Sequence, residues 1–189
     1  MQDDYGDPKY WDKLYSQKQG ESYDWLYLGY SELRHVVTKY VSQANSVLHV
    51  GCGNSQLSQE MHASGDFKKI ANIDVSPSVI EQMAEKEASN PDLTWAVMDC
   101  RKLEYSEGTF DFIIDKTTVD ALLCGKNPAL NVARYLAEAY RVLKPSCYYI
   151  LVSYARPALR LKHLQRQHVR WEISQEIVKR NKTEYFVYI

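Results

Sequence analysis

Short apolar segments alternate along the chain with segments in which apolar residues recur at helical spacing. Intervening stretches such as Ser76–Ala88 and Ala129–Leu143 have the spacing of helices. Alternation of this kind is typical of a mostly parallel sheet with helices on both faces, so the pattern predicts the α/β fold class. The apolar segments predict seven strands, which lie at 47–51, 70–75, 93–99, 110–115, 147–154, 169–178 and 183–189.

Local signals predict where several elements begin and end. A helix is expected to begin at Ser76-Pro77, because serine can cap free backbone amides and proline has no amide hydrogen to lose. Lys144-Pro145 is expected to end the helix before the fifth strand. Only Lys179–Thr183 separates the last two strands, which is too short for a crossover helix, so the chain is predicted to end in an antiparallel hairpin.

The composition fits a single domain over residues 1–189, with 45% hydrophobic residues and no obvious linker. A formal net charge of −1 gives no general attraction for nucleic acid. The start of the chain does not resemble a signal peptide and no apolar run has membrane-spanning length, so a cytoplasmic, reducing setting is expected. No zinc site or disulfide framework is expected from the scattered cysteines Cys52, Cys100, Cys124 and Cys147.

The first strand runs into a Gly-x-Gly turn at Gly51–Gly53, and the next strand ends on a carboxylate, Asp74. Glycine leaves room for a ligand to approach the backbone, while the carboxylate can accept hydrogen bonds from ribose hydroxyls. The third strand ends on Asp99 at the same edge, where it suits an adenine amino group. Because Asn54–Gln56 lacks the third glycine of dinucleotide folds, an adenosine compound without phosphates is favoured. The alternative is that the glycines only relieve strain.

The chain carries five motifs in order, which are Tyr10–Tyr15, Tyr23–Trp25, His49–Ser55, Met98–Leu103 and Asp115–Leu122. They resemble those of the class I S-adenosylmethionine-dependent methyltransferases, which have a Rossmann-like, seven-stranded sheet. Within that family, the chain is similar to a eukaryotic branch that contains the elongation factor 1A lysine methyltransferases and the methyltransferase region linked to endothelin-converting enzyme 2. The resemblance covers Tyr10–Ile189, but Thr117 stands where the family has glycine, and the segment after Leu123 is shorter than in some relatives.

The resemblance implies S-adenosyl-L-methionine as cofactor and S-adenosyl-L-homocysteine as product. It implies that Gly51 contacts the methionine part of the cofactor and that Lys116, just past the fourth strand, faces its amino-acid group. The adenosine contacts that it implies are Asp74 at the ribose hydroxyls, Val75 beside the adenine ring, and Asp99 and Cys100 at the adenine edge.

The resemblance also implies that an N-terminal segment, residues 1–30, folds over the cofactor with the aromatic residues Trp11, Tyr15 and Trp25. Aromatic faces stabilise a sulfonium cation and exclude water around the transferring methyl group. The alternative is that these rings only pack on the sheet as part of the core.

Two carboxylates near the predicted substrate mouth, Asp115 and Asp120, are the candidate catalytic residues. A lysine amine must lose a proton before it attacks, and either carboxylate, or water alone, can serve that step. An ordinary helical ion pair between Asp120 and Lys116, four positions apart, is the alternative role. The basic stretch Arg156–Arg170 contains no acid and is either a solvated helix face or a docking strip for an acidic partner.

The sequence thus predicts a protein-lysine N-methyltransferase, with elongation factor 1A or a similar protein as its substrate by resemblance. One fold serves many methyl acceptors, so a small-molecule methyltransferase is an alternative. A cofactor-binding partner subunit without activity is a third. Neither a membrane nor a nucleic-acid partner is expected. The lack of an Asn-Pro-Pro-Tyr-like run after the fourth strand argues, again by resemblance, against methylation of adenine amino groups.

Overall fold

A seven-stranded sheet runs through the computed structural model of the chain, which describes residues 5–18 and 22–189. The spatial order of the strands is β3-β2-β1-β4-β5-β7-β6, and β7 runs antiparallel to both of its neighbours while the other pairs are parallel. The predicted mostly parallel sheet with a C-terminal hairpin is therefore confirmed. The strands are β1 Ala44–Val50, β2 Phe67–Asp74, β3 Leu93–Val97, β4 Phe110–Lys116, β5 Leu143–Ser153, β6 Gln175–Arg180 and β7 Thr183–Tyr188.

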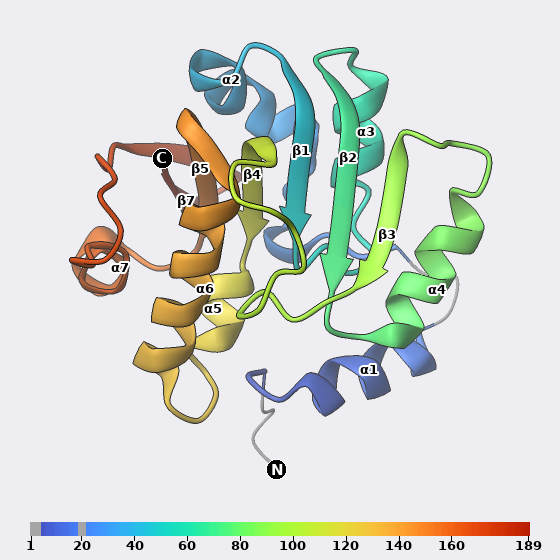
Figure 1. Ribbon diagram of the computed structural model, residues 1–189, viewed down its shortest axis with the longest axis horizontal. Coiled ribbons are helices and arrows are strands. Elements are labelled where there is room, and N and C mark those ends of the chain that lie inside the picture. The colour runs from blue at the N-terminus through green and yellow to red at the C-terminus, as the bar shows by residue number, and fades with distance from the viewer. Residues whose placement is uncertain (1–4, 19–21) are drawn as a thin grey trace.

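Helices cover both faces of the sheet, as the alternating pattern predicts (Figure 1). One face holds α2, α3 and α4, and the other holds α5, α6 and α7, while α1 packs on α4. Within the described residues, no helix has the length and apolar character that spanning a bilayer requires. The helices are α1 Pro8–Gln17, the short 3-10 helix η1 Trp25–Tyr27, α2 Tyr30–Tyr40, α3 Leu57–Ala63, α4 Pro77–Lys86, α5 Thr118–Leu122, α6 Pro128–Val142 and α7 Pro157–Leu164.

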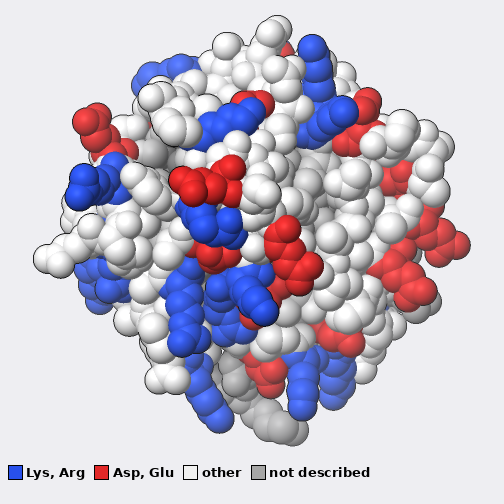
Figure 2. All heavy atoms as spheres, in the orientation of Figure 1, with Lys and Arg blue, Asp and Glu red and all other residues white. Residues whose placement is uncertain are grey.

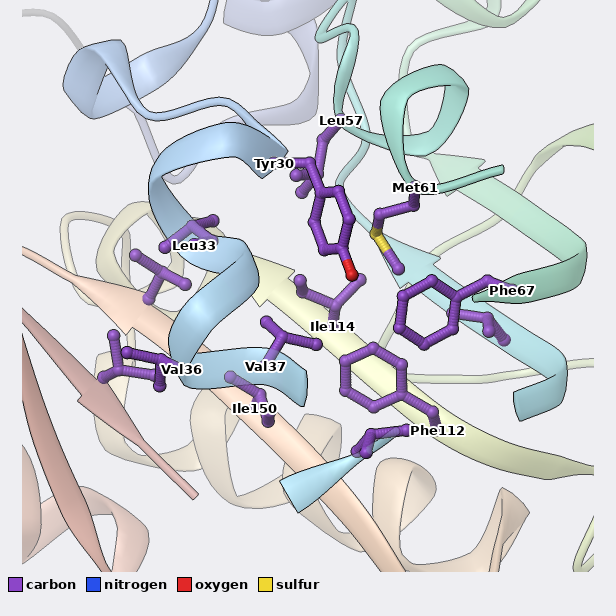
Figure 3. Close-up of a cluster of buried hydrophobic side chains, with 14 of the residues drawn as sticks. Tyr30, Leu33, Val36, Val37, Leu57, Met61, Phe67, Phe112, Ile114 and Ile150 are labelled. Carbon is purple, nitrogen blue, oxygen red and sulfur yellow. The ribbon is translucent and has the colours of Figure 1, made fainter. Parts of the chain in front are cut away.

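The core on the α2 face forms because alternate residues of the central strands meet one apolar stripe of that helix. Figure 3 shows Leu33 and Val37 of α2 on the side of the sheet where Ile114 of β4 and Ile150 of β5 lie, and all four side chains are fully buried. Phe112, two positions before Ile114 on the same face of β4, packs against the Phe67 ring of β2 with 5.6 Å between centroids. This row on β4 continues toward the carboxyl edge of the sheet.

The predicted boundaries hold for the helix start at Ser76, whose side chain accepts a hydrogen bond from the Val79 amide. The prediction of a strand over 169–178 is wrong in its first half, because β6 begins only at Gln175. Val169, Trp171 and Ile173 alternate with polar residues as in a strand, yet they pack against the core under α6. A period of two reports that alternate side chains are buried, not that the backbone pairs with another strand.

The order in which strands are added to the sheet reverses between β1 and β4. These two strands lie side by side although β2 and β3 come between them in sequence. The helices that follow these two strands, α3 and α5, lie on opposite faces of the sheet. Their separation leaves a crevice at the carboxyl ends of the strands, where open α/β sheets bind ligands. In Figure 1 the arrowheads of β1, β2 and β3 point to this edge, beside α1.

Candidate functional site

A cavity lies at the carboxyl edge of the sheet and encloses about 700 Å³, part of it open to solvent. Eight of the nine residues that the sequence predicts as cofactor contacts line it, and Lys116 does not. The lining residues are Tyr5, Gly6, Pro8, Trp11, Tyr15, Trp25, Gly51, Ile73, Asp74, Val75, Met98, Asp99, Cys100, Arg101, Thr117, Thr118, Ala121 and Leu122.

The turn after β1 leaves space that a side chain would close. Gly51 and Gly53 both have positive φ, at 62° and 50°, a conformation that costs glycine little. A Cβ atom at Gly51 would overlap the Thr118 hydroxyl, and one at Gly53 would overlap the Tyr15 hydroxyl. The glycines therefore let α5 and α1 approach the strand end closely, which is a stronger requirement than relief of strain alone.

Asp74 at the end of β2 is buried, and each of its carboxylate oxygens holds one backbone amide. Oδ2 accepts from the Gly53 amide at 2.9 Å and Oδ1 from the Ser76 amide at 3.0 Å. Burial raises the pKa of Asp74, and these donors oppose the rise. Since a carboxylate oxygen can accept more than one hydrogen bond, both oxygens keep capacity for a pair of ligand hydroxyls.

Asp99 is held by Arg101, a cavity residue that the sequence reasoning missed. The Arg101 guanidinium donates from Nε and Nη2 to both Asp99 oxygens, at 2.9, 3.1 and 2.7 Å, and its Nη1 donates to Asn131 Oδ1 of α6. Burial raises the pKa of Asp99, but the Arg101 hydrogen bonds outweigh it and hold the pKa below its usual value. An arginine two residues after the strand-ending Asp99 was the available signal.

The aromatic residues of the N-terminal segment form one ring cluster over the cavity. Trp11 lies 5.7 Å from Trp25 in an edge-on contact and 6.1 Å from Tyr15 in a stacked one, between ring centroids. Tyr5, which the sequence reasoning also missed, lies 6.2 Å from Trp25, and its carbonyl accepts from the Trp11 indole at 2.7 Å. Part of the predicted covering segment, residues 1–4 and 19–21, lies outside the described residues.

Helix α1 is attached to the sheet through the start of α4. The Asp12 carboxylate accepts from the Ser76 hydroxyl at 2.8 Å and from the Ser78 amide at 3.0 Å. These donors lower the pKa of Asp12, as expected for an anion beside a helix N-terminus. The Tyr15 carbonyl accepts from Gln82 of α4 at 3.1 Å, so α1 is held at its middle and near its C-terminus.

Lys116 points away from the cavity, contrary to its implied contact with the amino-acid group of a cofactor. Its ammonium lies 2.5 Å from Asp24 Oδ1, 2.9 Å from the Leu28 carbonyl and 3.3 Å from the Ser55 hydroxyl. The reason is strand alternation, which places Lys116 on the α2 face in the same row as Phe112 and Ile114. An ion pair between Lys116 and Asp120 does not form.

Asp115 lies on the opposite face from Lys116 and is fully buried under α5 and α6. One oxygen accepts from the Thr118 amide at 2.7 Å and the other from the Tyr149 hydroxyl at 3.1 Å. Burial raises the pKa of Asp115 to about 7, against the lowering effect of these donors. The carboxylate therefore fixes the first turn of α5 and does not line the cavity that the described residues enclose.

Asp120 is also buried and pairs with Arg160 of α7, which removes both from the cavity surface. Asp120 Oδ1 also accepts from the Ser153 hydroxyl at 2.7 Å. Burial raises the pKa of Asp120, and Arg160 opposes the rise. Arg160 accordingly does not belong to an exposed docking strip, although Arg156, Lys162 and Arg170 in the same stretch are exposed.

Comparisons with known proteins assign the family. Residues 48–151 match the methyltransferase domain family. The chain is 37% identical over 156 residues to the eEF1A lysine and N-terminal methyltransferase of Mus musculus, covering 81% of this chain but 22% of that protein. It is 32% identical over 178 residues to EEF1A lysine methyltransferase 4 of Bos taurus, covering 89% of this chain and 69% of that protein.

Solved structures share the fold. N-methyltransferase NodS from Bradyrhizobium japonicum WM9, crystallised with S-adenosyl-L-homocysteine, has a TM-score of 0.68 at 13% identity and covers 94% of this chain and 96% of its own. A SAM-dependent methyltransferase from Methanosarcina mazei has a TM-score of 0.63 at 19% identity, with 81% and 94% covered. The chain therefore belongs to the S-adenosylmethionine-dependent methyltransferases with the class I fold.

Thr117 provides a test of strain at the cavity wall, because it has a φ of 72° where the resemblance places glycine. A β-branched residue in the left-handed region costs about 1–2 kcal/mol, part of which is offset by the greater entropy of unfolded glycine. We expect Thr117→Gly to raise the free energy of unfolding by up to about 1 kcal/mol in urea titrations. Thr38→Gly, in the regular helix α2, should lower it by about 0.3–0.5 kcal/mol.

Asp115 provides a test of pH dependence. Its pKa is raised to about 7 in the folded protein, so the unfolded state loses the proton first and stability falls as the pH rises through this range. Asp115→Asn keeps the shape and removes the titration. The wild-type free energy of unfolding should drop relative to the variant by up to about 4 kcal/mol between about pH 4 and about pH 7. A constant difference across this range would contradict the buried carboxyl.

Proposed function

We propose that this chain is a protein-lysine N-methyltransferase that acts on elongation factor 1A or a similar protein. The observation that carries the proposal is the similarity to relatives, up to 37% identical, that are named as eEF1A lysine methyltransferases. A cavity at the carboxyl ends of the strands, lined by the predicted cofactor contacts, supports it. The chain spans only 22% of the length of the first of these relatives, so the remainder of that protein is outside the comparison.

The cavity residues fit the cofactor that the family uses. We assign the space beside Gly51 to the methionine part of S-adenosylmethionine and the free acceptor capacity of Asp74 to the ribose hydroxyls. Val75 and Cys100 would border the adenine ring, and Asp99 would accept from its amino group with the lone pairs that Arg101 leaves. The product S-adenosyl-L-homocysteine would use the same contacts.

The bound cofactor supplies an electrophilic methyl group on a sulfonium sulfur. The rings of Trp11, Tyr15 and Trp25 would shield that cation from water and favour it through their faces. The substrate lysine would lose its ammonium proton to water before it could accept this methyl group. Because Asp115 and Asp120 are buried away from the cavity, we assign them to positioning of α5 and not to proton transfer.

Basic and acidic side chains gather on different parts of the face that Figure 2 shows. Figure 2 shows Lys and Arg gathered toward the lower left, over α6, and Asp and Glu along the right edge, near α4. The proposal assigns the exposed members of the strip, Arg156, Lys162 and Arg170, to contact with an acidic face of the substrate. We also propose the cytoplasmic location expected from the sequence.

The cofactor assignment predicts a specific loss of affinity. Asp74→Ala removes the acceptor of the ribose hydroxyls, and a hydrogen bond to a charged group contributes about 1.5–3 kcal/mol, so S-adenosyl-L-homocysteine should bind about 10–150-fold more weakly in calorimetric titrations. Asp111→Ala is the control. Asp111 lies near the amino end of β4, at the opposite edge of the sheet from the cavity, so this variant should leave the affinity unchanged. Equal affinity in Asp74→Ala and the wild type would remove Asp74 from the site.

The substrate assignment predicts added methyl groups. Purified protein with S-adenosylmethionine should increase the intact mass of elongation factor 1A in steps of one methyl, at a lysine that peptide mapping identifies. Higher salt should slow the reaction on the intact factor more than on a short lysine peptide, because only the folded partner presents an acidic face.

A second experiment, labelling of a cell extract with methyl-tritiated cofactor, distinguishes the alternatives. Labelling of extractable metabolites only, with methyl-tritiated cofactor in a cell extract, would replace the proposal with a small-molecule methyltransferase. Cofactor binding without labelling of any species would indicate a non-catalytic partner subunit.

A further inference from the structure

A strained turn lies between two residues that bind the same buried ammonium. Leu26 and Tyr27 both have positive φ, at 67° and 55°, which is rare for two consecutive non-glycine residues. Backbone of this kind costs about 1–3 kcal/mol per residue and persists only where the surroundings hold it. Lys116 binds the residue before the turn, Asp24, through its carboxylate and the residue after it, Leu28, through its carbonyl.

The Lys116 ammonium is buried inside the protein, so water does not replace its hydrogen-bond partners. The Lys116 side chain is 3% exposed, whereas the Asp24 side chain is 22% exposed. Burial raises the pKa of Asp24, but Lys116 outweighs this and holds the pKa below its usual value, so the carboxylate stays ionised. The Ser55 hydroxyl donates to the same carboxylate, which ties the turn to the loop after β1.

The turn also carries one wall of the cavity. Trp25, directly after Asp24, lines the cavity and contacts Trp11 and Tyr5. Its neighbour Tyr23 lies 5.1 Å from the Trp25 ring, and Tyr27 is 63% exposed at the outer side of the turn. Lys116 thus acts on the cavity through the turn, without touching the cavity itself.

We propose that Lys116 is a positioning residue, which together with Asp24 and Ser55 latches Tyr23–Leu28 over the cavity and so preforms the Trp25 wall. This inference rests on the proposed function only where it concerns ligand affinity. If the latch opens, a ligand must first restore the wall, and its apparent affinity becomes the intrinsic affinity multiplied by the fraction of molecules in which the wall is in place.

The experiment compares variants that break the latch with variants that only destabilise β4. Lys116→Met removes the ammonium, and Asp24→Asn is the milder second variant that keeps its shape. Phe112→Leu weakens the core on the same face of β4, and Lys144→Met breaks the ion pair with Asp111 at its other end, where the atoms are 2.6 Å apart. All variants carry Trp95→Phe and Trp171→Phe, since neither indole N–H has a partner among the described residues.

This background leaves Trp11 and Trp25 as the fluorescent residues of the four tryptophans, so acrylamide quenching reports the wall directly. Without ligand, both latch variants should be quenched more strongly than the background protein, and both controls should not. Affinity for S-adenosyl-L-homocysteine should fall about tenfold or more in the latch variants and stay within about twofold in the controls. Urea titrations show which variants remain folded. If Lys116→Met does not fold, the result for Asp24→Asn tests the latch.

Three results would overturn the inference or separate it from the function. Unchanged quenching in a folded latch variant overturns the latch. Increased quenching with unchanged affinity overturns the positioning role. If the background protein itself does not bind S-adenosyl-L-homocysteine, the cofactor assignment fails, and quenching alone then decides whether the latch exists.

Discussion

Two neighbouring residues of opposite charge, Asp115 and Lys116, are buried at the end of β4, and strand alternation sends them to opposite faces of the sheet. Neither polar side chain can be left without partners in the interior without a large cost, so each requires donors or acceptors from another part of the chain. Asp115 obtains them from α5 and Tyr149, and Lys116 from Asp24 and Leu28. One strand end therefore positions both the helix on one side of the cavity and the turn that closes it.

The cavity is built for binding and exclusion of water more than for acid–base chemistry. Its carboxylates, Asp74 and Asp99, accept hydrogen bonds from backbone amides and from Arg101. The wall that the N-terminal segment forms consists of aromatic rings. Methyl transfer suits such a site, because most of the acceleration can come from alignment of two reactants in a dry environment.

The cover is attached at two independent places, which have different chemistry. Helix α1 is held by Asp12 at the start of α4, an anion beside free helix amides. The turn after it is held by the buried ammonium of Lys116. Trp11 belongs to helix α1 and Trp25 to the turn that Lys116 holds. The contact between these rings therefore joins the two parts of the cover.

The sequence by itself determined the sheet, its hairpin and the glycine and carboxylate positions at the strand ends, because these depend on local periodicity and on turns that only certain residues adopt. It also identified the rings of Trp11 and Trp25 as cavity residues, through motifs and not through spacing. It left open an ion pair between Lys116 and Asp120, which does not form, because a spacing of four residues permits such a pair without excluding better partners. Only the tertiary structure brings Asp24 and Arg160 to these buried charges, from positions 92 and 40 residues away in the chain.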